Sequence, residues 1–381
     1  MQKNQLKHIY LDYAAATPID KAVTKEMQKY QTIYANPSSI HSLGKQAEDY
    51  IEDCRERIAK ILNCHSSEII FTSGGTESNN LVLHGMKKAV RLIITTAIEH
   101  QSILKTTEFL KDEKLTLIVL DVGRKGKIDL GQLESLITPE CLVSIGYVNN
   151  ELGTVQEIAA ISRIIQKKKK EFGADSIYFH TDACQAEFQL LNVKKLGVDM
   201  LTLNSSKIYG PKGAGLLYVK TTTPIKPLFF GGQQEKDLRA GTENLLAIVG
   251  LAKALEINEE IKQKDKKRII QLYNYFQKQL KQIKNITINS QYSHILSITI
   301  DGCDSQIILN YLDQENIYAS AGSACTAGNN EPSYVLKAIG LSTEEAISTI
   351  RFSLGRDTTR KNIDFVVRKL KKIVDRLRKI G

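Results

Sequence analysis

Short, continuous apolar runs alternate with stretches of helical periodicity between about residue 46 and residue 256 of the 381-residue chain. Most runs are apolar at consecutive positions, which is typical of strands that are buried on both faces. Buried strands that alternate with helices predict an α/β fold, a largely parallel sheet covered by helices. Functional residues of such sheets gather at the carboxyl ends of the strands. The predicted strands are 69–71, 92–94, 115–120, 142–148, 177–179, 200–203 and 215–219.

The pattern changes beyond residue 256, where shorter strand candidates lie between two long amphipathic helices. We therefore predict a large domain over 16–256 and a smaller α+β domain built from 1–15 and 257–381. The elements expected in the smaller domain are a helix at 254–283, strands at 295–300, around Ile317 and at 350–354, and a last helix at 363–380.

The composition favours a globular cytoplasmic protein. The formal net charge is +10, but the basic runs lack aromatic interleaving, so we interpret them as solvated helix faces and expect no nucleic-acid binding; a basic patch for a partner is the less favoured alternative. The six scattered cysteines form no Cys-x-x-Cys spacing, which predicts neither a metal site nor a disulfide framework. No apolar run approaches the ~20 residues that span a bilayer, and no signal peptide is recognisable at the N-terminus.

Lys207 follows one apolar run and precedes a Gly/Pro-rich turn, a place where the chain can hold an electrophile covalently. A lysine amine forms Schiff bases with carbonyl compounds. Asp182 ends another apolar run, and an aspartate beside such a lysine suggests pyridoxal phosphate (PLP), whose ring nitrogen needs an acidic partner. The alternative is a surface lysine in a turn.

A glycine-rich turn, Thr72-Ser-Gly-Gly-Thr-Glu-Ser-Asn79, follows the first predicted strand and opens a helix. Because a helix N-terminus offers free N–H groups and a positive dipole, Gly75 and Thr76 are candidate phosphate contacts. A plain helix cap is the alternative.

Three other strand ends carry polar side chains suited to a flat, ionisable cofactor. His100 could stack on the ring and transfer protons near neutral pH. Asn150 could hydrogen-bond a ring hydroxyl, while Asp182 pairs with the ring nitrogen and Gln185 reaches the phenolic oxygen. The alternatives are a structural histidine, a turn asparagine and a helix N-cap at Asp182.

Cys325 lies among Gly, Ala and Ser residues, where a cysteine has little to pack against and a nucleophile is expected. Cys303 is the competing exposed thiol, and the other four cysteines are expected to be packing residues. Arg351 lies in an apolar strand, where a buried guanidinium needs an anionic partner. That partner is either a substrate carboxylate or a structural salt bridge.

Together these pieces resemble the cysteine desulfurases of the NifS/IscS type, within the aminotransferase class V, fold-type I PLP enzymes. The resemblance covers nearly the whole chain in order and spacing. Its segments are 10–18, 36–39, 72–78, 99–100, 148–151, 181–185, 207–213, 239–244, 320–325, 331–337 and 350–356.

The resemblance implies a homodimer that takes sulfur from L-cysteine, releases alanine and passes the sulfur to an acceptor, such as an iron–sulfur scaffold or a sulfur carrier. Cys325 would carry the sulfur as a persulfide. Lys207 would bind PLP covalently and His100 would act as acid and base. Arg351 and Asn36 would bind the substrate. The implied cofactor ligands are Gly75, Thr76, Asn150, Asp182, Gln185, Asn204, Ser206 and, across the dimer, Thr242.

One departure from the family lies directly before the lysine. The family commonly has Ser and His there as phosphate ligands, whereas this chain has Asn204, Ser205 and Ser206. We therefore predict weaker phosphate binding. Selenocysteine lyase or another class V activity (β-lyase or aminotransferase) is one alternative function. A PLP-binding partner protein with impaired catalysis is the other.

Overall fold

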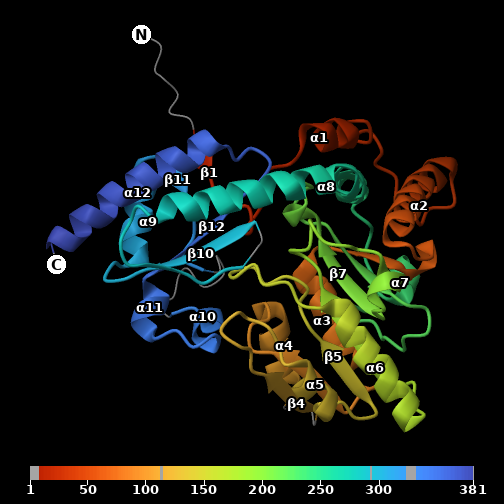
Figure 1. Ribbon diagram of the computed structural model, residues 1–381. Coiled ribbons are helices and arrows are strands. Elements are labelled where there is room, and N and C mark those ends of the chain that lie inside the picture. The colour runs from red at the N-terminus through yellow and green to blue at the C-terminus, as the bar shows by residue number, and fades with distance from the viewer. Residues whose placement is uncertain (1–7, 112–114, 292–293, 323–331, 381) are drawn as a thin grey trace.

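The computed structural model describes residues 8–111, 115–291, 294–322 and 332–380 (Figure 1). Its centre is a sheet in the order β2-β8-β7-β6-β5-β3-β4. All neighbouring pairs are parallel except β8, which runs antiparallel to both β2 and β7. The strands are β2 Ile69–Thr72, β3 Leu92–Thr96, β4 Thr116–Leu120, β5 Cys141–Ser144, β6 Ile177–Asp182, β7 Met200–Asn204 and β8 Gly215–Val219. The predicted mainly parallel sheet of seven strands is confirmed.

Helices cover both faces of this sheet because successive strand residues point to opposite sides. In β2, Ile69 and Phe71 join the core beneath α2, α6 and α8, whereas Ile70 joins the core beneath α3 and α4. The helices of this part are α1 Lys21–Gln28, α2 Ser42–Leu62, α3 Gly75–Met86, α4 Gln101–Lys111, α5 Leu130–Leu136, α6 Ile158–Phe172, α7 Val193–Leu196 and α8 Leu245–Leu280. Three single turns, η1 Ser66–Glu68, η2 Ser205–Lys207 and η3 Gln234–Asp237, lie between them.

The C-terminal part has its own core, to which the N-terminal segment contributes. Ile9 and Leu11 pack there with residues from 269 onward, and β1 pairs in parallel with β11. Figure 1 shows this N-terminal strand among the C-terminal elements. The strands are β1 Ile9–Tyr10, β9 Ile286–Ile288, β10 Ile295–Ile300, β11 Ile317–Tyr318 and β12 Thr349–Ser353, of which β12-β10-β9 form an antiparallel sheet. The helices are α9 Ser305–Gln314, α10 Tyr334–Ala338, α11 Thr343–Ile347 and α12 Arg360–Ile380.

Two predicted elements differ from the structure. The run at 142–148 ends as a strand at Ser144, although the backbone N–H groups of Ile145 and Tyr147 still donate to the carbonyls of His180 and Asp182 in β6. The helix predicted at 254–283 begins earlier, at Leu245, because the Asn244 side chain caps it by accepting a hydrogen bond from Ala247 N–H. The result is one 36-residue helix that packs against α1, α2 and α12.

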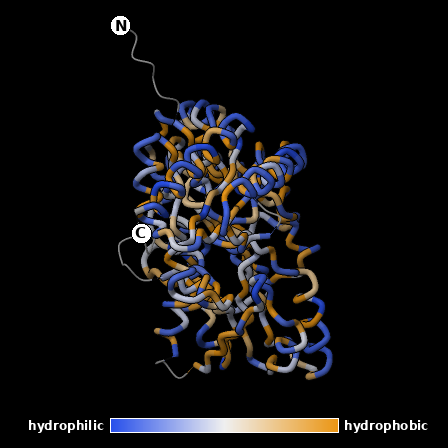
Figure 2. The backbone as a smooth tube through the Cα atoms, turned by 60° about the vertical axis from the view of Figure 1, so that its left-hand side comes forward, coloured by the Kyte–Doolittle hydropathy of each residue, from blue (hydrophilic) through white to orange (hydrophobic). Residues whose placement is uncertain are grey.

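Polar and apolar residues alternate along the covering helices (Figure 2). This is the distribution expected of helices that bury one stripe against a core. Among the described residues, no helix combines the length and the apolar character that a membrane crossing requires.

Candidate active site

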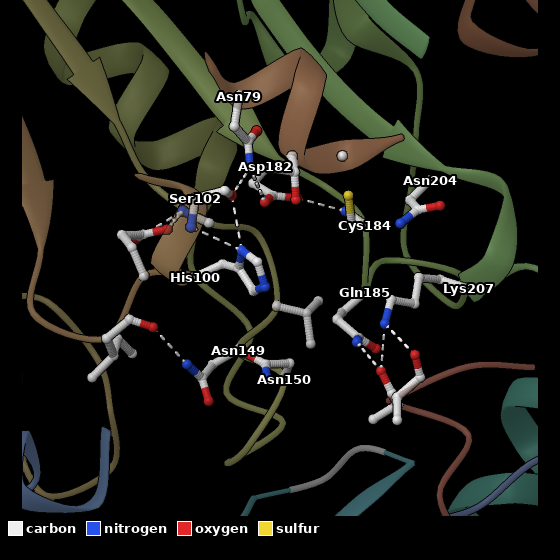
Figure 3. A pocket seen from close by; sticks show the side chains of 18 of the residues that line it. Asn79, His100, Ser102, Asn149, Asn150, Asp182, Cys184, Gln185, Asn204 and Lys207 are labelled. Atoms are coloured by element: carbon white, nitrogen blue, oxygen red, sulfur yellow. Dashed lines mark hydrogen bonds between the residues drawn. The ribbon is translucent and has the colours of Figure 1, made fainter. Parts of the chain in front are cut away.

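A cavity of about 260 Å³ opens at the carboxyl ends of the central strands (Figure 3). It brings together residues that the sequence separates by more than 270 positions, from Gly75 to Arg351. The predicted site residues that line it are Gly75, Thr76, His100, Asn150, Asp182, Gln185, Asn204, Lys207 and Arg351.

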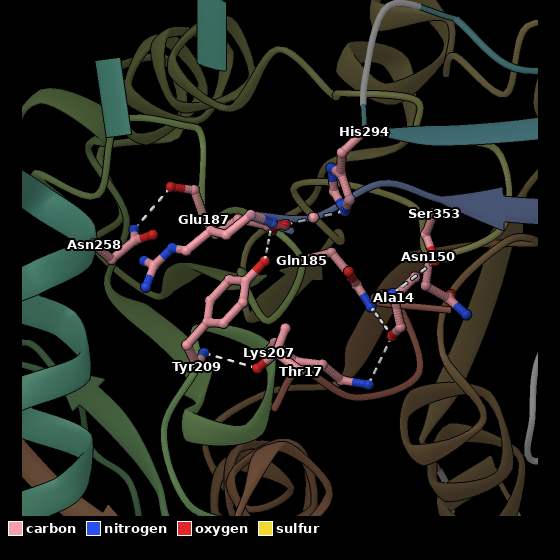
Figure 4. A network of polar contacts seen from close by, with 12 residues as sticks. Ala14, Thr17, Asn150, Gln185, Glu187, Lys207, Tyr209, Asn258, His294 and Ser353 are labelled. Carbon is pink, nitrogen blue, oxygen red and sulfur yellow. Dashed lines mark hydrogen bonds and ion pairs between the residues drawn. The ribbon is translucent and has the colours of Figure 1, made fainter. Parts of the chain in front are cut away.

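Lys207 enters the cavity from the single turn that follows β7. Its Nζ donates hydrogen bonds to the carbonyl oxygens of Ala14 (2.9 Å) and Ala15 (2.6 Å), as Figure 4 shows for Ala14. The amide of Gln185 donates to the same Ala14 oxygen at 2.7 Å. The N-terminal segment therefore supplies the acceptors that hold the amine at the cavity wall.

Asp182 ends β6, and hydrogen bonds fix both of its oxygens. Oδ2 accepts from Asn79 Nδ2 at 2.7 Å, and Oδ1 accepts from the backbone N–H of Cys184 at 2.9 Å. Asn79 also donates to Ser102 Oγ at 2.9 Å. Asn79 lies one turn into α3, so the helix that begins at Gly75 also orients the carboxylate at the cavity floor.

His100 faces the cavity with its Nδ1 directed at Ser102 (Figure 3). Nδ1 accepts from the backbone N–H of Ser102 at 3.1 Å, so the neutral ring carries its proton on Nε2. Burial lowers the pKa of His100, the Asp182 carboxylate opposes this effect, and Lys207 adds to it. His100 is therefore neutral at pH 7, and it carries a transferable proton on Nε2, the ring nitrogen that is not directed at Ser102.

Glu99 is a buried carboxylate directly before the histidine. It accepts hydrogen bonds from Gly146 N–H (2.9 Å) and Thr96 Oγ1 (2.7 Å), which tie the ends of β3 and β5 together. Burial raises the pKa of Glu99 to about 7. Sequence reasoning gave no role to Glu99, Asn79 or Ser102, although each lies within three residues of a predicted site residue.

The N-terminus of α3 forms a cradle opposite Lys207. A Cβ on Gly75 would lie 2.6 Å from Cys184 Sγ. Only glycine at this position therefore allows the backbone N–H groups at the start of α3 to line the cavity. Next to it, Asn204 Oδ1 accepts from the N–H (3.2 Å) and the hydroxyl (3.1 Å) of Ser206. The two residues hold each other, and of the pair Asn204 lines the cavity while Ser206 does not.

Arg351 reaches the cavity from β12 and is 2% exposed. Its Nη2 donates to Asp12 Oδ1 at 2.7 Å and its Nη1 donates to the carbonyl oxygen of Asn150 at 2.9 Å. The guanidinium thus has a structural carboxylate partner and also faces the space where a ligand would lie.

The other predicted residues either do not line the cavity or fall outside the described part of the chain. Cys325 and its neighbours at 323–331 lie outside the described residues. Farther along the chain, Ser333 Oγ donates to Glu151 Oε2 at 2.5 Å and Tyr334 Oη donates to the Glu99 carbonyl at 2.6 Å, so residues 333 and 334 are tied to the site. Asn36 and Thr242 are exposed and do not line the cavity.

Two cysteine predictions are wrong. Cys303 is 2% exposed, because it packs in the core of the C-terminal part. Cys184, expected to pack in the core, lines the cavity instead, since its turn places it beside Gly75. Burial raises the pKa of the Cys184 thiol well above its usual value, so this thiol is not ionised.

The family described as aminotransferase class V matches residues 9–366. The cysteine desulfurase IscS of Dictyoglomus turgidum is 40% identical over 98% of this chain and 96% of its own. Among solved structures, a NifS-like protein superposes with a TM-score of 0.90 at 33% identity, over 97% of this chain and all of the other. The structure of SspA in complex with cysteine superposes with a TM-score of 0.75 at 35% identity, over 91% of this chain and 98% of the other.

Proposed function

The chain belongs to the aminotransferase class V family and is a PLP-dependent cysteine desulfurase, and we propose that the residues of the cavity described above carry out its reaction. One observation supports this assignment most: Lys207, Asp182 and the N-terminus of α3 meet in one cavity although they come from three separate parts of the chain.

The donor set of the cavity fits the cofactor. The cradle at Gly75 suits the phosphate, since free backbone N–H groups and the dipole of a twelve-residue helix point into it. The fixed carboxylate of Asp182 suits the ring nitrogen, and the Lys207 amine suits the aldehyde. When bound, PLP supplies an electron sink for charge that develops at the substrate's α-carbon.

Each protein group then has a distinct task. Lys207 binds the cofactor covalently, and Asp182 keeps its ring nitrogen protonated. Neutral His100 holds a transferable proton on Nε2 beside the cavity. Arg351 binds the α-carboxylate of L-cysteine through its guanidinium.

We assign the sulfur-accepting role to Cys325. Its thiolate forms a bond to the substrate sulfur while the substrate's C–S bond breaks. The electron pair of that bond stays with the substrate β-carbon, which takes a proton and leaves as part of L-alanine. The product on the enzyme is a Cys325 persulfide, from which an acceptor thiol takes the outer sulfur. We propose a protein acceptor, either an iron–sulfur scaffold or a sulfur carrier for thio-cofactor assembly.

We also propose that the enzyme is a cytoplasmic homodimer. Three large apolar side chains, Tyr34, Ile40 and Phe230, are each more than four-fifths exposed. Pro37 and Gly232, which lie close to them in the sequence, line one groove. Large apolar side chains gathered on one face favour a protein interface. Exposed Thr242 belongs to the same region and would reach the partner's phosphate. A cytoplasmic location agrees with the free thiols of the described cysteines.

The same structure supports a division into a large domain, 16–256, and a small domain formed by 1–15 and 257–381. The small-domain core contains Ile9 and Leu11 but no residue between 12 and 268 among its fully buried members. The boundary at 256 would fall inside the continuous helix α8.

Alanine release from L-cysteine tests the sulfur-accepting role. We expect Cys325→Ala to lower the rate at least about a hundredfold, since the proposed sulfur-accepting thiol is gone, while cofactor absorbance stays unchanged. The matched control is Cys303→Ala, which removes a buried thiol that does not line the cavity and should keep the rate. Undiminished alanine release by Cys325→Ala would show that another group accepts the sulfur.

A further inference from the structure

Two acceptors hold the guanidinium of Arg351, but among the described residues one of its nitrogen atoms has no hydrogen-bond partner. Asp12 accepts from Nη2 and the Asn150 carbonyl accepts from Nη1. Nε is buried and has no hydrogen-bond partner among the described residues. Arg351 lines the cavity but Asp12 does not, so Asp12 would not contact a ligand bound there.

The position of Arg351 does not depend on Asp12 alone. Arg351 lies in the middle of β12, opposite Ser297 of β10, and exchanges backbone hydrogen bonds with Ser320 at 2.7 and 3.1 Å. Its side chain is packed to 2% exposure. Removing the charge of Asp12 would therefore change the electrostatics of the guanidinium more than its location.

The reaction requires a limit on how tightly Arg351 binds carboxylates. L-cysteine and L-alanine carry the same α-carboxylate, so Arg351 binds substrate and product alike. Binding that is equal in both states lowers KM without raising kcat, and it delays product release. A buried guanidinium without a counter-ion is a strong anion site in a low-dielectric environment.

We propose that Asp12 is a positioning residue that acts through Arg351 and sets how tightly carboxylates bind in the cavity. Its negative charge offsets part of the guanidinium's attraction, so that L-cysteine binds and L-alanine leaves. This inference rests on the proposed role of Arg351 as the carboxylate site.

The test compares wild-type holoenzyme with Asp12→Asn, which keeps the side-chain shape and an acceptor oxygen for Nη2. We expect KM for L-cysteine and the Ki values of L-alanine and propionate each to fall about tenfold, because one opposing charge is gone. The value of kcat should stay the same or fall. Propionamide, which resembles propionate but has no charge, should inhibit both enzymes equally. Asp12→Glu, which retains the charge, should restore the wild-type Ki of propionate.

The variant Arg351→Gln separates this inference from the assignment beneath it. If Arg351→Gln leaves the Ki of propionate unchanged, Arg351 is not the carboxylate site and both proposals fail. If Arg351→Gln weakens propionate binding but Asp12→Asn leaves it unchanged or weaker, only the role of Asp12 is wrong. Should Asp12→Asn lose its thermal transition, Asp12→Ser removes the same charge, and the same Ki of propionate decides the question.

Discussion

At the level of single residues, the phosphate end of the cavity uses neutral groups. Asn204 and Ser206 hydrogen-bond each other, and the α3 N-terminus adds backbone N–H donors. A histidine at position 206 would add a cation when protonated. Coulomb attraction to a phosphate is substantial in a partly buried site, so we expect the absence of this cation to weaken cofactor binding.

Ser206→His should therefore tighten PLP binding about tenfold at pH 6 and less at pH 8.5, where the imidazole is neutral. The measurement is the PLP dissociation constant of the apoprotein, followed by visible absorbance. Ser206→Asn, which adds a neutral side chain, is the control and should bind as the wild type does. Equal affinity of Ser206→His and Ser206→Asn at both pH values would contradict this explanation.

At the level of elements, η3 is held to the sheet by one buried carboxylate. Glu235 accepts from Arg55 Nη1 (2.7 Å) and Nη2 (2.8 Å) and from the backbone N–H of Phe71 (2.8 Å). Glu235 also lies in a left-handed conformation with φ of 47°, and Lys236 and Asp237 follow with 59° and 62°. Such backbone costs free energy for residues other than glycine, so the buried contacts must hold it in place.

Glu235→Gln should lower the free energy of unfolding by about 3 kcal/mol, because Arg55 stays buried without its counter-ion. Glu52→Gln removes a second carboxylate partner of the same arginine, but the Glu52 side chain is 50% exposed. This control variant should lower the free energy of unfolding by less than about 1 kcal/mol. Urea denaturation measures both variants, and equal losses would show that burial does not set the strength of the pair.

The elements also show how far a sequence can be interpreted. Continuous apolar runs identified the central strands, since burial on both faces leaves that pattern along the chain. The short edge strand β9 was missed, because it is three residues long and largely exposed. Glu99, Asn79 and Ser102 were missed as site residues because their contacts depend on groups that are brought near only by the fold. Cys303 was misjudged because its polar neighbours in sequence gave no sign that it packs in the core of the C-terminal part.

At the level of the whole molecule, a buried acid and a buried imidazole join the two parts of the chain. Glu187 Oε1 lies 3.1 Å from His294 Nε2, and the carbonyl of Glu187 accepts from Asn258 of α8 at 2.8 Å (Figure 4). Burial raises the pKa of Glu187 to about 8 and lowers that of His294 to about 3. Both groups are therefore neutral at pH 7. Lys207 and Arg356 face Glu187, Arg351 faces His294, and the Phe188 ring contacts the imidazole.

This pair predicts a pH dependence of stability. Above pH 6.5 the unfolded chain has already lost the Glu187 proton, whereas the folded chain keeps it up to about pH 8. The folded state binds the extra proton, so its stability falls as pH rises through this window, by about 2 kcal/mol in total. The side chain of the Glu187→Gln variant cannot ionise. Between pH 6.5 and 8.5 this variant should therefore lose about 2 kcal/mol less stability than the wild type.

The control is Glu108→Gln, which replaces an exposed carboxylate on α4 and should follow the wild-type curve. Urea denaturation at three pH values gives the comparison. Parallel curves for the wild type and Glu187→Gln would mean that Glu187 is already ionised in the folded protein at pH 6.5.

The most direct test of the desulfurase assignment is the mass of the Cys325 peptide after the holoenzyme meets L-cysteine. We expect that peptide to become one sulfur atom heavier, with the addition lost on reduction by a thiol, and L-alanine to appear in equal amount. The peptides that contain Cys184 and Cys303 should keep their mass. Alanine formation with an unmodified Cys325 peptide, or sulfur on another cysteine, would contradict the proposed mechanism.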